Sequence, residues 1–294
     1  MDNAEDTPIL CRDDKDNDGD GRVDCDDQDC QPLYTCTVDD DTETDSSSAS
    51  DEDIWVKIYS STFQMGSDDD DPSEAPMHPV YILSFEIMRT EVTVAMYQAC
   101  MSDGACEEPA SFADCISSEY SALMEAAPEQ YPMACVNWYQ AAAFCEWFDA
   151  RLPSEAEWEK MASSGQLEKT YPWGDSNASC GLAVIDYESD GPGCGLGHPW
   201  PVCSKPSGNT GNEICDAIGN VREWLEDDIH PNYEGAPTNG DPWIDDPRGE
   251  GRIVRGSAFD DGWEITASTR RWCDPEEGCD ISDEMNGYGF RCAR

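Results

Sequence analysis

The 294-residue sequence predicts a loop-rich α+β domain that is cross-linked by disulfides and preceded by a small Asp-rich segment. Three observations support this prediction. Clear helical periodicity is confined to a few short stretches, the sixteen cysteines are even in number and dense, and 20 acidic residues face only three basic ones before residue 54. Short strands and long loops bury little surface by themselves, so we expect disulfides and bound cations to supply part of the stability.

Residues 1–38 are predicted to form a calcium-binding segment. With Asp16 as position 1, oxygen ligands fall at positions 1, 3, 5, 9 and 12 and a glycine at position 6, the pattern of an EF-hand-type loop. The ligands would be the carbonyl of Arg22 and the side chains of Asp16, Asp18, Asp20, Asp24 and Asp27. The alternative interpretation is an acidic tail without order. Residues 39–53 contain a Ser-rich run and are predicted to be a flexible linker.

The large domain is predicted to begin at residue 54, where Ile54–Tyr59 alternates like a strand. One helix is expected over Val92–Met101 and another over Trp138–Phe148, where apolar residues recur on one face at helical spacing. A third should begin at a capping box made by Ser154 and Glu157. The large indole side chains of this region are interpreted as core anchors: Trp147, Trp158, Trp173 and Trp224.

Charge and cysteine content restrict the class of protein. The formal net charge of −47 disfavours nucleic acid and anionic membranes as partners. It suits a saline habitat for the body of the protein and divalent cations for the N-terminal segment. The cysteine density indicates a secreted, periplasmic or cell-surface protein. No signal peptide is visible after Met1, and we interpret this as a trimmed or recombinant start. Zinc is disfavoured because no Cys-x2-Cys pair occurs, and no run of 18 apolar residues predicts a membrane span.

Three ordered motifs lie within the large domain: Arg151-Leu-Pro-Ser-Glu-Ala-Glu-Trp158, Gly219-Asn-Val-Arg-Glu-Trp224 and Gly289-Phe-Arg-Cys292. Together they resemble the formylglycine-generating enzyme (sulfatase-modifying factor) family, whose domain is a calcium-bearing variant of the C-type-lectin-like fold. The resemblance implies that residues 54–294 form one such domain, with a disulfide between Cys145 and Cys292. Other close pairs enclose loops of plausible length, but spacing leaves their connectivity open: Cys100/Cys106, Cys180/Cys194, Cys203/Cys215 and Cys273/Cys279.

The same resemblance implies a calcium-binding turn over residues 216–223. Its ligands would be the side chains of Asp216 and Glu223 and the carbonyls of Gly219 and Val221. Hard carboxylate and carbonyl oxygens are suitable ligands for calcium. Arg222 stands where the family usually has an aromatic residue, and we expect its side chain to face the surface. The alternative is a capped turn that buries Trp224 without a metal.

Active members of the family oxidise a substrate cysteine to formylglycine with oxygen, using a copper ion held by two cysteine thiolates. Following the turn at Arg255-Gly-Ser257, the resemblance places Asp261 and Thr266 at those two positions. Soft copper needs soft thiolate ligands, so we expect a non-catalytic binding or structural module. The alternative is an active oxidase whose cysteine pair has moved to Cys273 and Cys279.

The segment between Phe259 and Gly287 lies where related folds place ligand contacts. By this resemblance the candidate contacts form a groove, and they are Asp260, Asp261, Trp263, Arg270, Arg271 and Trp272. Aromatic and arginine side chains are typical anchors of recognition surfaces. The sequence leaves the ligand open between a protein and a carbohydrate.

Overall fold

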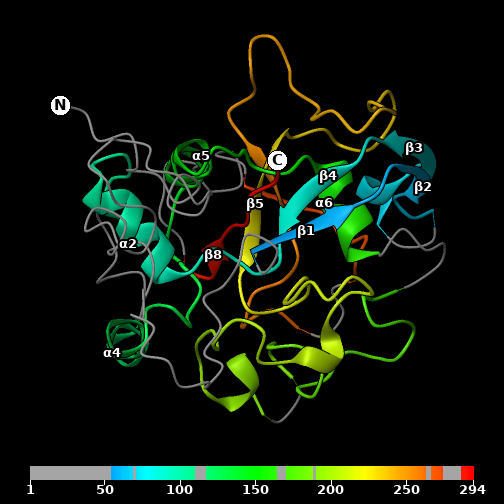
Figure 1. Ribbon diagram of the computed structural model, residues 1–294. Coiled ribbons are helices and arrows are strands. Elements are labelled where there is room, and N and C mark those ends of the chain that lie inside the picture. Colours follow the sequence, from blue (N-terminus) through cyan, green and yellow to red (C-terminus); the bar gives the residue numbers. More distant parts are fainter. Residues whose placement is uncertain are drawn as a thin grey trace, which may run out of the picture.

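Short strands and helices alternate with long loops along the large domain (Figure 1), for which the computed structural model describes residues 54–68, 71–109, 117–163, 170–187, 190–262, 266–273 and 286–294. The strands are β1 (Trp55–Ile58), β2 (Ser61–Met65), β3 (His78–Ile82), β4 (Phe85–Met88), β5 (Arg222–Asp228), β6 (Arg252–Arg255), β7 (Arg271–Cys273) and β8 (Tyr288–Gly289). The α-helices are α2 (Val94–Ser102), α4 (Ser118–Ala126), α5 (Trp138–Trp147) and α6 (Glu155–Ala162). Short 3-10 helices are η3 (Pro72–Glu74), η4 (Pro192–Gly195) and η5 (Pro206–Gly208).

The strands form two ribbons and one sheet. β1 pairs antiparallel with β4, and β2 pairs antiparallel with β3. The sheet has the order β7-β6-β5-β8, and β5 and β8 are parallel within it. The chain end continues beside β4, because Met88 N donates to Cys292 O and Glu86 N donates to Arg294 O. The C-terminus therefore lies among β4, β5 and β8 near the middle of the view in Figure 1.

The three predicted helices are present, with ends shifted by one or two residues. α2 is capped by Thr93, α5 by a capping box of Asn137 and Gln140, and α6 by the predicted capping box of Ser154 and Glu157. α4 was not predicted. Its signal is present in the sequence, since apolar residues at 120, 123, 124 and 127 follow the N-cap at 117, but the pattern covers little more than two turns.

Two large clusters of buried side chains form most of the core, and two smaller ones lie in the loop region. One large cluster gathers α2, α5 and the last strand, and the other lies between the two ribbons and α6. Trp158 and Trp224 are fully buried, as expected of core anchors. Trp147 and Trp173 are only half-buried, and they pack against the edges of core clusters. The indole of Trp147 donates to Asp103 at 2.9 Å, so an exposed polar partner holds it at the surface.

Disulfides connect distant parts of the fold. Cys145 on α5 is bonded to Cys292 next to β8, which confirms the pair that the resemblance implied. The structure also contains the pairs Cys100–Cys106, Cys180–Cys194 and Cys203–Cys215. Cys273 is disulfide-bonded, while Cys279 lies outside the described residues.

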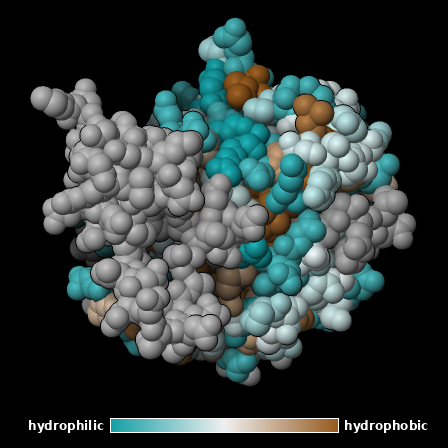
Figure 2. All heavy atoms as spheres, viewed as in Figure 1, coloured by the Kyte–Doolittle hydropathy of each residue, from teal (hydrophilic) through white to brown (hydrophobic). Residues whose placement is uncertain are grey.

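The described surface is mostly hydrophilic on the face shown in Figure 2, where apolar residues occur in small isolated groups. Scattered apolar residues of this kind are normal on a protein surface. None of the helices described is long and apolar enough to cross a membrane.

Candidate calcium turn and ligand groove

The predicted calcium turn has a backbone that only certain residues permit. Asp216, Gly219 and Asn220 have φ angles of 53°, 88° and 67°, in the left-handed region that favours glycine and asparagine. At Gly219 a Cβ would lie 2.5 Å from the carbonyl oxygen of Val184, so no other residue fits without a shift of backbone. The Cys203–Cys215 disulfide fixes the start of the turn.

Three buried carboxylates gather at this turn: those of Glu91, Asp216 and Glu223, which are 0%, 8% and 1% exposed. Asp216 Oδ2 accepts a hydrogen bond from Cys203 N at 2.6 Å. Glu91, which is distant in sequence, accepts from two residues of the turn: from Asn220 Nδ2 at 2.8 Å and from Val221 N at 3.3 Å. Glu91 was not predicted as a site residue, because an acid next to the start of α2 is also typical of helix capping.

Glu223 has the strongest protein partners of the three. Arg291 donates to its two oxygens at 2.7 and 2.8 Å, and the indole of Trp158 donates at 2.8 Å. Arg291 is fully buried and also donates to the carbonyls of Met88 and Cys215. These contacts connect all three sequence motifs, since Trp158, Glu223 and Arg291 come from one motif each.

Negative charge exceeds positive charge at this turn. Burial, partly offset by the Cys203 amide and Arg291, raises the pKa of Asp216 to about 6. Burial and the Asp216 carboxylate raise the pKa of Glu91 well above its usual range. The cations that oppose them are Arg291 and, at the side of Asp216, Lys205. The carboxylates are therefore poised to gain from a further cation.

One cluster in the described part of the chain brings potential ligand atoms of three residues within 4.8 Å of one another: Cys203, Cys215 and Asp216. Its two sulfur atoms are joined in a disulfide, so the carboxylate is the donor that remains. An oxygen donor of this kind suits a hard cation rather than copper or zinc.

The predicted groove is centred on Asp261. Its Oδ1 is 2.7 Å from Arg222 Nη2 and 3.4 Å from Arg271 Nη2, and its Oδ2 accepts from Ala258 N at 2.9 Å. Asp260 lies 3.5 Å from the same Arg222 nitrogen. The surface-facing position expected for Arg222 is wrong: its side chain is 13% exposed, because it pairs with Asp261 and lies over the ring of Tyr288.

Next to this ion-pair cluster lies a cavity of about 340 Å³, lined by Asp71, Glu74, Thr269, Arg270, Arg271, Trp272 and Tyr288. Three of the predicted contact residues are therefore at one cavity. Arg270 does not lie on the exposed rim of the groove as expected. It is 5% exposed and donates to both oxygens of Glu155 at 2.7 and 3.0 Å. Arg270 thus forms a structural wall, while Arg271 is 40% exposed and accessible to a ligand. Trp263 lies outside the described residues.

Thr266, the second position implied for a reactive cysteine, belongs to a hydroxyl cluster. Its Oγ1 is 3.1 Å from Ser268 Oγ and 3.0 Å from Thr269 Oγ1, and its backbone nitrogen donates to Thr269. The predicted calcium loop of the N-terminal segment (Asp16, Asp18, Asp20, Arg22, Asp24 and Asp27) and the linker 39–53 lie outside the described residues.

A family model described as "Sulfatase-modifying factor enzyme 1-like domain" matches residues 40–294. Among individual proteins, the serine/threonine-protein kinase Pkn1 of Chlamydia trachomatis is 27% identical over 248 residues, which cover 81% of this chain and 38% of the kinase. The chain thus spans about two fifths of the length of that relative. The formylglycine-generating enzyme of Bos taurus is 25% identical over 283 residues, covering 81% of this chain and 74% of the enzyme.

The solved structure of PvdO from Pseudomonas aeruginosa has a similar fold. Its TM-score is 0.63 at 25% identity, and the match covers 82% of this chain and 93% of PvdO.

Proposed function

The chain belongs to the family of sulfatase-modifying factor enzyme 1-like domains, and we propose that its large domain is a calcium-stabilised, non-catalytic binding module of C-type-lectin-like type in an exported protein. The observation that carries this proposal is the state of the sulfur atoms. No cysteine in the described part of the chain is free, and Cys273, half of the displaced pair considered above, is buried in a disulfide. A copper site of two thiolates has no donors there.

The side chains at the implied reactive positions have other roles. Asp261 binds Arg222 and the Ala258 amide, and Thr266 binds neighbouring hydroxyls. These contacts order the wall of the groove rather than expose a nucleophile. The groove would act by recognition, with Arg271 offering charge and Trp272 and Tyr288 offering aromatic surface beside the cavity. Its ligand would be a protein or a carbohydrate, and the net charge of −47 argues against nucleic acid.

Calcium would be held at the turn by the side chains of Asp216 and Glu223 and the carbonyls of Gly219 and Val221. The ion would supply the positive charge that the buried acids lack. Support comes from the excess of carboxylates around Arg291 and from the raised pKa of Asp216. Glu91 would orient the turn through Asn220 and the Val221 amide. A second calcium is proposed for the N-terminal loop from its sequence pattern.

The non-catalytic proposal is tested by incubating the calcium-loaded protein with copper, oxygen and a sulfatase-type cysteine peptide. Mass spectrometry should detect no formylglycine, and titration of the folded protein with Ellman's reagent should find no reactive thiol. Formylglycine in the peptide, lost in a Cys279→Ser variant, would establish the oxidase instead.

A further inference from the structure

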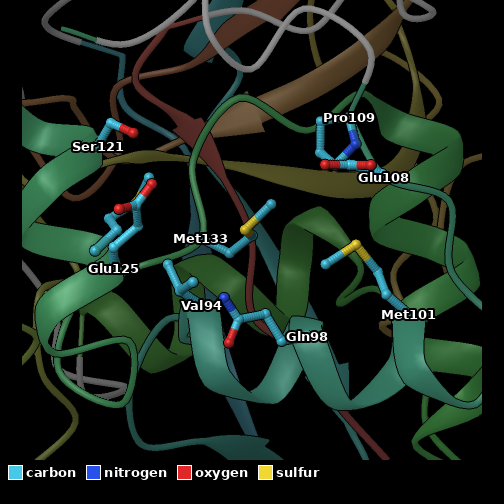
Figure 3. A pocket seen from close by; sticks show the side chains of 9 residues that line it. Val94, Gln98, Met101, Glu108, Pro109, Ser121, Glu125 and Met133 are labelled. Carbon is cyan, nitrogen blue, oxygen red and sulfur yellow. The ribbon is translucent and has the colours of Figure 1, made fainter. Parts of the chain in front are cut away.

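A second cavity, of about 220 Å³, lies between α2 and α4 and shares no residue with the groove or the calcium turn (Figure 3). It is lined by Val94, Gln98 and Met101 of α2, Ser121, Met124 and Glu125 of α4, Glu108 and Pro109 after α2, and Met133 before α5. The Cys100–Cys106 disulfide ties the end of α2 to the loop that follows it. The cavity therefore lies between two helices, and the end of one of them is cross-linked.

The interior of the cavity is apolar and adaptable. Val94, Met124 and Met133 are 4%, 2% and 3% exposed, and the half-buried Met101 completes this surface. Thioether side chains are polarisable and have several rotatable bonds, so they adjust to apolar groups of different shape. A short hydrocarbon chain would therefore find a well-fitting surface between α2 and α4.

The mouth of the cavity carries uncompensated negative charge. Figure 3 shows Glu125 and Glu108 on opposite sides, with Met133 between them and Gln98 on α2 below. The cavity lining contains no lysine, arginine or histidine. Within the described part of the chain, the carboxylates of these two residues form no hydrogen bond or ion pair. A cation in the cavity would thus be attracted by both carboxylates, and the strongly acidic protein would attract it from a distance.

We propose that this cavity binds an aliphatic ammonium group, whose hydrocarbon chain lies against the methionines and whose cationic end lies between Glu108 and Glu125. The ammonium group can belong to a free amine or to a lysine side chain of a partner protein. Each presents about four methylenes and one positive charge. The methylenes match the apolar interior, and the charge matches the acidic mouth.

The test is calorimetric titration of the full-length, calcium-loaded chain with n-butylammonium, with 1-butanol and butyrate as neutral and anionic probes of similar size. Butylammonium should bind at least tenfold more tightly than butanol, and butyrate should not bind. Along a series from ethylammonium to butylammonium, affinity should rise by about fourfold per methylene. Equal affinity for butanol and butylammonium, or no binding of butylammonium at millimolar concentration, would overturn the proposal.

Variants locate the site. Glu108→Gln combined with Glu125→Gln should weaken butylammonium binding by about tenfold or more, because both ionic contacts are lost. Glu129→Gln, at an exposed acid beyond the end of α4, removes one surface charge without touching the cavity and should leave the affinity unchanged. Ser121→Phe should block the cavity without changing its charge. An unchanged affinity in the double variant would show that the amine binds elsewhere.

A final pair of probes distinguishes the two sources of the amine. N-acetyl-lysine methylamide carries the lysine side chain on a peptide backbone. Tighter binding of this probe than of butylammonium would favour a partner protein, and tighter binding of butylammonium would favour a free amine. Either order supports the shared chemistry, provided that binding is lost in the double variant.

Discussion

Buried arginines in this domain each hold a carboxylate from a distant part of the chain. Glu155 binds Arg270, Glu159 binds Arg255 and Glu223 binds Arg291, and all six side chains are nearly inaccessible to solvent. Removing one partner of such a pair leaves an uncompensated charge in the interior, at a cost of about 3–5 kcal/mol. These residues are therefore structural, even where they line a cavity.

Asp227 on β5 differs, because backbone amides donate to both of its oxygens: Oδ1 accepts from Trp243 N and Oδ2 from Glu155 N, both at 2.8 Å. Burial and the Glu155 charge raise the pKa of Asp227 to about 8. The native state thus keeps a proton that the unfolded state has already released. The stabilisation that follows is fully present below about pH 4 and is lost as the pH rises through about 8.

We expect Asp227→Asn to flatten this part of the pH dependence of the free energy of unfolding, as measured by urea denaturation between pH 4 and 9. The difference between wild type and variant isolates this residue from the other acids. Asp241→Asn, an exposed acid, should leave the slope unchanged. A variant with the wild-type slope would show that Asp227 titrates normally.

The proposed stabilisation by calcium can be tested at a single ligand residue, Asp216. Asp216→Asn should remove most of the rise in melting temperature that calcium gives the wild-type protein, since one of the two anionic ligands is lost. For an ion at about 100 times its Kd, that rise corresponds to about 2.7 kcal/mol. Glu234→Gln, an exposed change, should keep the full calcium response. Equal calcium responses in wild type and Asp216→Asn would contradict the ligand assignment.

α6 and α5 organise the domain at the level of elements. Three glutamates of α6 bind three arginines from separate segments, so this short helix connects Arg151, Arg255 and Arg270. α5 is attached covalently to the chain end by Cys145–Cys292, which closes a loop of 147 residues. Long loops restrict the unfolded chain most, so this disulfide should matter more than the short ones.

We expect replacement of Cys145 and Cys292 by alanine to lower the free energy of unfolding by about 5 kcal/mol, and replacement of Cys100 and Cys106 to lower it by about 2 kcal/mol. The second pair is separated by only 6 residues. Guanidinium denaturation of the two double variants measures the difference. Equal losses would indicate that native-state contacts, rather than loop length, decide the contribution of each disulfide.

For the whole molecule, the two proposed calcium sites should have different effects: one orders the N-terminal segment, and the other stabilises the large domain. Limited proteolysis with calcium should leave both the N-terminal segment and the large domain intact. After chelation we expect rapid cleavage before residue 54, because the N-terminal segment has too few apolar residues to form a core. Residues 54–294 should survive as one fragment with a lower melting temperature. Cleavage within residues 1–38 at the same rate with and without calcium would contradict a calcium loop there.

The sequence by itself determined the features that depend on local pattern. Helix positions followed from periodicity and from capping boxes such as Ser154 with Glu157, because a cap satisfies backbone amides within one turn. The motifs around Trp158, Glu223 and Arg291 identified the family and the Cys145–Cys292 bond. The turn over residues 216–223 was implied by the same resemblance, and the structure shows that only glycine fits at its position 219.

The tertiary structure decided which charges are free. Glu91 binds the predicted calcium turn although 125 residues separate it from Asp216, Arg222 turns inward to Asp261, and Arg270 pairs with Glu155. Pairing in the interior depends on which segments pack together, and no local pattern records that choice. The same holds for the cavity between α2 and α4, because its apolar interior and acidic mouth come from four separate segments.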